Sequence, residues 1–260
     1  MEVHAHTHPS TSSGHRKKWT HYFWEFLMLF LAVFCGFLAE NKREHMIEKH
    51  RAHELVIPLL EDIREDTSAL NSLIEMREKQ TKALDTIRDI MKDEDWKMGS
   101  RKLYSLFRFY TRRLEFQNRN TTIDQLINSG YLRYFKDRQL VSLIQQYVID
   151  MQLVKDRQSR ELQLMNNSID PISTKFFDQS AYEQPISELD KIIPESKFMI
   201  RNINEFKKDD FINQLVFLDQ IRKVNNSKVY NRKALESAIK LLDQLALDFP
   251  GEVKKVFSKN

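Results

Sequence analysis

Residues 22–39 read YFWEFLMLFLAVFCGFLA, an apolar run that only Glu25 interrupts. At about 1.5 Å of rise per residue, a helix of this run together with Trp19 and Thr20 covers the roughly 30 Å hydrocarbon core of a bilayer. We therefore predict one transmembrane anchor over residues 19–39. A flexible, basic, His-rich tail over residues 1–18 precedes it.

The end of the run favours an anchor that is retained over a signal peptide that is removed. Signal peptidase prefers small residues one and three positions before its cut, and ahead of Glu40 these positions hold Ala39 and the bulky Phe37. Lipid modification at Cys35 is disfavoured because the bulky Phe34 precedes it. The alternatives are a removed signal sequence and a buried hydrophobic helix.

Both flanks of the anchor are basic, so the positive-inside rule gives only a small preference. Arg16, Lys17 and Lys18 lie directly before the anchor, whereas the basic residues after it alternate with glutamates. A short basic tail is easily retained inside, and a long domain can be translocated regardless of its charge. We expect a cytoplasmic N-terminus and an external C-terminal domain.

Small residues recur at four-residue spacing within the anchor, in the pairs Ala32 with Gly36 and Cys35 with Ala39. This spacing lets two helices approach closely, which indicates a homodimer face. The alternative is a span that does not dimerise, because small residues are common in such spans as well.

Composition predicts that the rest of the chain is helical. The 260 residues include five Gly and six Pro, and Leu, Ile, Glu, Lys, Arg and Gln are abundant. We predict an all-α fold in which one N-terminal transmembrane helix is followed by a long-helix antiparallel bundle. Its parts are juxtamembrane and central helices over residues 40–168, a Pro-containing connector over 169–208, and C-terminal helices that pack on the bundle over 209–260.

Apolar residues after the anchor follow a seven-residue grid, with a second set three places after grid positions. Asp66, Arg77 and Gln80 interrupt the pattern. We interpret the segment as a helix packed within a bundle, either continuous or divided at Pro58, with a dimeric coiled-coil stalk as the alternative. The apolar members are Val56, Ile63, Leu70, Leu84 and Met91 on the grid, and Leu59, Leu73 and Ile87 after it.

Residues 121–132 hold local helix signals. Thr122 and Gln125 have the spacing of a capping box, and Gly130 suits the left-handed residue that ends a helix. We expect a short helix here and a long helix from about Asp137 to Asn167.

Two apolar stripes predict the C-terminal helices, and a polar stretch over residues 225–228 separates them. An antiparallel return of these helices onto the earlier ones would bury both stripes. The first stripe is Phe211, Leu215, Leu218, Ile221 and Val224, and the second is Leu235, Ile239, Leu242 and Leu245.

The distribution of His and Cys excludes several kinds of catalysis in the C-terminal part. All eight histidines lie in the first 53 residues, and Cys35 is the only cysteine. Residues 54–260 therefore cannot form a Cys/His pair, a Ser/His/Asp triad or a zinc site of His and Cys by themselves. Glycine-dependent phosphate, dinucleotide and calcium loops are missing too. We predict no catalytic residue, no cofactor and no enzyme, although paired carboxylates or a Ser/Lys arrangement remain formally open.

Two groups of residues are weak candidates for binding. His4, His6 and His8 alternate in the N-terminal tail and could ligate a metal, with a solvated tail as the alternative. Arg101, Arg108 and Arg112 share one face of an amphipathic segment and could contact anions such as lipid headgroups, with a plain solvated face as the alternative. The net charge of +4 is small, so nucleic acid is not an expected partner.

The chain resembles an uncharacterised single-pass membrane family of Gram-negative bacteria, a domain of unknown function. The resemblance rests on the span with its early Glu25, on residues 60–67 (LEDIREDT), and on a mid-domain pattern. That pattern is Leu126, Ser129, Gly130 and Leu132. The resemblance implies a membrane protein and provides no catalytic residues. We expect the protein in the bacterial inner membrane.

We interpret the chain as a membrane-anchored, non-enzymatic interaction or scaffolding protein of the cell envelope. Its expected partners are the lipid bilayer and either another protein or a second copy of itself. The alternative is a ligand-sensing input module that acts through a partner.

Overall fold

The computed structural model describes residues 15–93, 101–182 and 195–258, and every regular element within these ranges is a helix. The predicted all-α class is therefore confirmed. The chain divides into two units, residues 1–53 and residues 54–260.

The described part of the first unit is almost entirely α1 (His15–Glu54), which contains the predicted anchor. It is the one helix in the described ranges that is long and apolar enough to cross a membrane. Its most apolar stretch of 18 residues, here called the apolar window, has no buried residues. The core helix of a soluble domain would bury such a window. Large side chains along the window, including Phe26, Leu29 and Phe37, are instead exposed.

A local break separates α1 from α2 (Val56–Ile90) at Leu55. Pro58 has no backbone N–H to donate to the residue four positions earlier, which removes one bond of the helical ladder. The ladder resumes where Leu59 N–H donates to the Leu55 carbonyl at 3.0 Å. Of the two arrangements predicted for this segment, the structure has the divided one.

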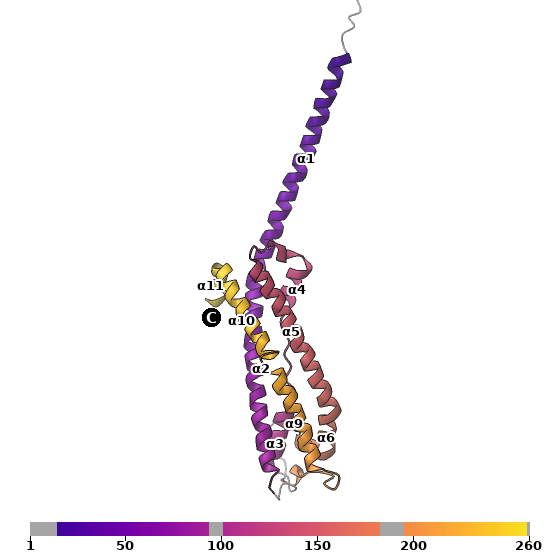
Figure 1. The fold of residues 1–260 in the computed structure, drawn as a ribbon, viewed down its shortest axis with the longest axis vertical. Coiled ribbons are helices and arrows are strands. Elements are labelled where there is room, and N and C mark those ends of the chain that lie inside the picture. The colour runs from indigo at the N-terminus through magenta and orange to yellow at the C-terminus, as the bar shows by residue number, and fades with distance from the viewer. Residues whose placement is uncertain (1–14, 94–100, 183–194, 259–260) are drawn as a thin grey trace, which may run out of the picture. The chain divides into compact units, whose positions relative to one another are not determined.

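Four long helices organise the second unit: α2, α5 (Arg138–Leu164), α9 (Lys208–Asn225) and α10 (Asn231–Asp248). Both α9 and α10 pack against α2 and also against α5 (Figure 1). The shorter elements in the described part of the unit are α3 (Arg101–Thr111), α4 (Thr121–Asn128), η2 (Tyr131–Tyr134), η3 (Met165–Ile169), α6 (Asp170–Phe176), α7 (Gln179–Tyr182), η4 (Glu195–Phe198) and α11 (Pro250–Phe257).

The apolar interior of this unit consists of two clusters. The first includes the α2 side chains from Val56 to Leu73 and packs them against α4, α5, α10 and α11. The second includes the side chains from Ala83 to Met91, at the C-terminal end of α2, and packs them against α3 and α9. In the second cluster the rings of Phe107 and Phe177 stack with centroids 4.3 Å apart. One face of α2 thus contributes to both clusters, its N-terminal part to the first and its C-terminal part to the second.

The seven-residue grid correctly predicted the buried face of α2, but its three polar members do not interrupt that face. Asp66, Arg77 and Gln80 are buried like their apolar neighbours on the grid. Each has hydrogen-bond partners from other segments, which offset the cost of removing polar groups from water.

The buried faces of the two C-terminal helices differ in part from the predicted apolar stripes. In α9 the buried set continues from Leu218 to Arg222 and Asn225, whereas Val224 is half exposed. In α10 Leu245 is buried as predicted and Leu235 and Leu242 are partly buried, whereas Ile239 is exposed and the buried set also includes Ala234 and Ala238. A stripe of large apolar residues leaves out buried alanines and buried polar residues, and both kinds are buried in α9 and α10.

The predicted capping box of α4 is also absent. The residue before the helix is Asn120, whose side chain makes no capping bond, and the Thr122 hydroxyl instead donates to Asp62 Oδ2 at 2.6 Å. The Thr122 hydroxyl therefore bonds a residue of α2 in place of the nearby backbone that a capping box would use. Gly130 does adopt the predicted left-handed conformation, with φ of 68°.

Candidate functional site

A layer of polar residues lies between the two apolar clusters of the second unit, and we call it the core polar layer. Its members are Arg77 and Gln80 on α2, Glu161 on α5, and Arg222 and Asn225 on α9. All five are buried. On each of these helices the polar residues lie on the same face as the buried apolar residues. The layer is therefore part of the same packed interior.

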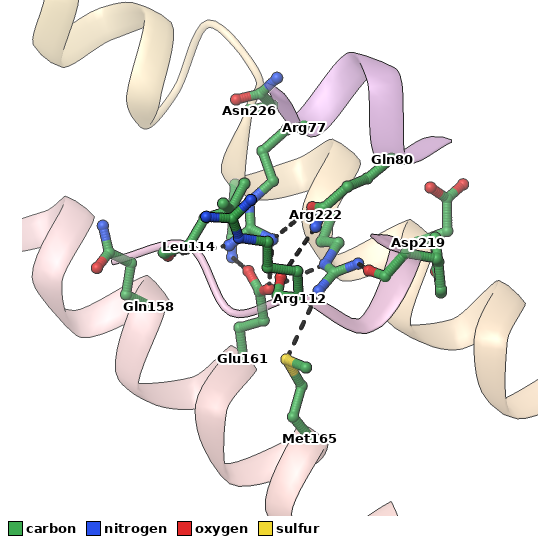
Figure 2. Close-up of polar contacts among 12 residues, drawn as sticks. Arg77, Gln80, Arg112, Leu114, Gln158, Glu161, Met165, Asp219, Arg222 and Asn226 are labelled. Carbon is green, nitrogen blue, oxygen red and sulfur yellow. Dashed lines mark hydrogen bonds and ion pairs between the residues drawn. The ribbon is translucent and has the colours of Figure 1, made fainter. Parts of the chain in front are cut away.

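Glu161 is the centre of the layer, because two guanidinium groups converge on one of its oxygens (Figure 2). Arg77 Nη1 lies 2.8 Å from Oε1, and Arg222 Nε lies 2.9 Å from the same atom. The other oxygen accepts from Asn225 Nδ2 at 3.4 Å. Three long helices are thereby joined through one carboxylate.

The same layer satisfies the carbonyl groups at the end of α3. The last carbonyls of a helix have no partner within it and carry partial negative charge. Gln80 Nε2 donates to the carbonyls of Phe109 and Arg112 at 3.2 and 2.9 Å, and Arg222 Nη1 donates to the Tyr110 carbonyl at 2.5 Å. The layer therefore fixes the end of α3 as well.

Formal charge in the core polar layer does not cancel, since two guanidiniums face one carboxylate. Burial lowers the pKa of Arg77 to about 10, an effect that the neighbouring Glu161 opposes, so Arg77 remains protonated at neutral pH. Burial also raises the pKa of the Tyr110 hydroxyl, which donates to the Leu215 carbonyl at 2.6 Å. The layer holds an excess of positive charge inside the protein.

Two pockets border the core polar layer. One, of about 260 Å³, is lined by Arg77 and Glu161 together with apolar side chains such as Phe116 and Leu162. Gln158 Nε2, in the wall of this pocket, is buried without a partner in the part of the chain that the structure describes. The other, of about 430 Å³, lies between α2, α9 and the start of α10, and both buried arginines line it. We call the second one the basic pocket.

A separate buried carboxylate, Asp66, joins α2 to α5. The backbone N–H of Arg119 donates to its two oxygens at 3.0 and 3.1 Å, and the Tyr147 hydroxyl donates to Oδ2. Burial raises the pKa of Asp66, and both of these donors oppose the rise. Asp66 therefore depends on its donors to stay ionised inside the core.

Replacing Tyr147 with Phe should lower the free energy of unfolding by about 1–3 kcal/mol at neutral pH, because a buried carboxylate loses a donor. The pKa of Asp66 in the folded state lies above its ordinary value of 3.8, so ionisation destabilises the fold as pH rises through that window. Losing the hydroxyl raises this pKa further. The cost of Tyr147→Phe should thus shrink on acidification, in denaturation curves measured across pH. Tyr131→Phe serves as control, and a cost for Tyr147→Phe that does not change with pH would contradict this role.

None of the three candidate arginines is a member of the core polar layer, although the backbone carbonyl of Arg112 accepts from Gln80 Nε2. His4, His6 and His8 fall outside the described residues. Arg101 lies 4.6 Å from the ring centre of Phe198, Arg108 is half buried, and Arg112 follows the end of α3. Among described residues, no cluster of three or more His, Cys, Asp or Glu side chains could hold a metal.

The four candidate residues for helix dimerisation all lie on α1, and all four are exposed. They are Ala32, Cys35, Gly36 and Ala39.

Sequence reasoning missed the acidic and basic members of the layer on α5 and α9. A signal was available for Arg222 and Asn225, because they continue the spacing of Leu215 and Leu218 at seven-residue intervals. Glu161 gave the same signal, because it continues the seven-residue spacing of Leu140, Tyr147 and Val154.

No protein family, curated protein or solved structure that was compared with this chain matches it.

Proposed function

We propose that this chain is a single-pass membrane protein whose helical C-terminal part acts by binding another protein or a second copy of itself. One observation carries the proposal. The apolar window of α1 has no buried residues, and such a surface is stable only where lipid or another helix covers it.

The buried carboxylates of the second unit support binding rather than catalysis. Glu161 and Asp66 are held by the donors described above, and Asp150 accepts from Ser237 Oγ at 2.5 Å and pairs with Lys233 at 3.0 Å. General acid or base catalysis needs a group that is free to exchange a proton with substrate. These carboxylates instead hold helices together.

We further propose an N-terminus in the cytoplasm and a second unit on the outer side of a bacterial inner membrane, in which the long helices form an antiparallel bundle. The unmixed basic residues before the span support this orientation. The resemblance to a single-pass family of Gram-negative bacteria supports the same location.

Self-association should occur through the small residues of α1. Cys35 is exposed on this helix, and oxidation of native membranes should therefore link two chains through it. Gly36→Leu should reduce the linked fraction about fivefold, because a large side chain separates closely packed helices. A Cβ at Gly36 meets nothing within 4 Å in the chain itself, so the loss would not come from a clash inside one chain.

Leu38→Ile is the matched control, since it lies two residues, or about 200°, around the helix from Gly36. The proposal predicts that this control links as well as the natural chain. Absence of any linked dimer in the natural chain, or equal linkage in Gly36→Leu, would contradict self-association through this face.

A further inference from the structure

We propose that the basic pocket binds a small phosphate-bearing anion, whatever partner the anchored protein has. The pocket belongs entirely to the second unit. Its wall includes five basic side chains and one acidic side chain. They are Arg77, Lys82, Arg222, Lys223, Arg232 and Glu78.

The ion pairs around the basic pocket do not remove its positive charge. Glu161 is shared by the two buried arginines. Asp219 pairs with Lys223 at 2.7 Å, and Glu78 pairs with Arg232 at 2.5 Å. With all three carboxylates counted against the five cations, a formal excess of two positive charges remains, which a dianion would neutralise.

The basic side chains divide into two groups by their burial. Arg77 and Arg222 are almost fully buried and committed to the core polar layer, so they contribute through their electric field, which is stronger in a low-dielectric interior. Lys82, Lys223 and Arg232 are exposed at the pocket. Lys223 and Arg232 keep their ion pairs with Asp219 and Glu78 and can share their remaining N–H donors with a ligand. The buried pair thus attracts an anion, and the exposed groups contact it.

Neutral donors are present in the same wall. Ser227 Oγ accepts from Val229 N–H at 3.2 Å, which leaves its hydroxyl hydrogen able to donate. Asn226 Nδ2 donates to the Ile74 carbonyl at 3.1 Å and fixes this side of the pocket to α2. A ligand would therefore bring α2, the end of α9 and the start of α10 together through one group.

Phosphate chemistry fits this arrangement best. A phosphate monoester carries about 1.5 to 2 negative charges at neutral pH on three acceptor oxygens of one compact group, and lysine and arginine are its usual ligands. A volume of about 430 Å³ lies at the small end of ligand pockets. It leaves room for a group larger than inorganic phosphate.

The test uses the full chain in nanodiscs of phosphatidylcholine, titrated with pyrophosphate in a calorimeter at constant ionic strength. Saturable binding is expected. Lys82→Gln should weaken it about fivefold, because one charge-assisted contact is lost. Lys240→Gln is the matched control, since Lys240 is an exposed lysine of α10 outside the pocket wall. It should bind as the natural chain does.

A second variant keeps the test independent of any effect of Lys82→Gln on folding. Glu78→Gln removes the acidic group of the wall and releases Arg232, so pyrophosphate should bind about threefold more tightly. The proposal is overturned by absence of saturable binding, by equal weakening in Lys82→Gln and Lys240→Gln, or by succinate binding as tightly as pyrophosphate.

Nanodiscs that also contain phosphatidylglycerol identify the source of the anion. Unchanged pyrophosphate affinity supports a free ligand in solution. Affinity that falls in the natural chain supports a lipid headgroup, which competes for the same phosphate site.

Discussion

Replacing Glu161 with Ala should lower the free energy of unfolding of residues 54–260 by about 3–5 kcal/mol. The substitution leaves the Arg77 and Arg222 guanidiniums buried without their shared carboxylate, and breaking a buried ion pair from one side costs about this much. Thermal denaturation of the full chain in detergent should show a melting temperature lower by about 10 °C for a domain of this size.

Two comparisons separate loss of the ion pairs from loss of packing. Asp156→Asn removes a carboxylate from the same helix at an exposed position and should be nearly neutral. Combining Glu161→Leu with Arg77→Met and Arg222→Met should recover most of the lost stability, because a buried ionic triad can be replaced by apolar side chains. An effect of Glu161→Ala below about 1 kcal/mol would show that the layer does not hold the helices together.

Paired lysines in the middle of α1 should abolish stable membrane insertion. Leu31→Lys with Phe34→Lys places two charges near the centre of the apolar window, and each costs about 2.5–3.5 kcal/mol there. The natural chain should remain in the membrane pellet after extraction at alkaline pH, and the lysine variant should move largely to the supernatant.

The apolar exchange Leu31→Phe with Phe34→Leu is the control for this second prediction. It keeps the composition of the span and should remain in the pellet. Retention of the lysine variant in the pellet would contradict the view that α1 anchors the chain by crossing the bilayer.

Elements of the fold that depend on local spacing could be predicted from the sequence. The long apolar helix α1 follows from one apolar run, and the buried face of α2 follows from a seven-residue repeat that includes its polar members. Gly130 was identified from its conformational freedom, which a helix end requires. In each case the signal lies within one helix or one turn.

The contacts within the core polar layer could not be predicted in this way, because the residues that pair there are distant in sequence. Arg222 and Glu161 are 61 residues apart, and Arg222 contacts the carbonyl of Tyr110 from 112 residues away. A charged or amide side chain in an apolar pattern is taken for a solvent-facing one until its buried partner is known. This explains why Val224 was expected inside α9 in place of Asn225.

The proposed topology is tested most directly by labelling one cysteine in intact cells. Cys35→Ser removes the natural thiol, and Lys228→Cys places a new one at an exposed position between α9 and α10. The account predicts that a membrane-impermeant thiol reagent labels this cysteine before the cells are lysed. Protection until lysis would contradict it, because the second unit would then lie in the cytoplasm.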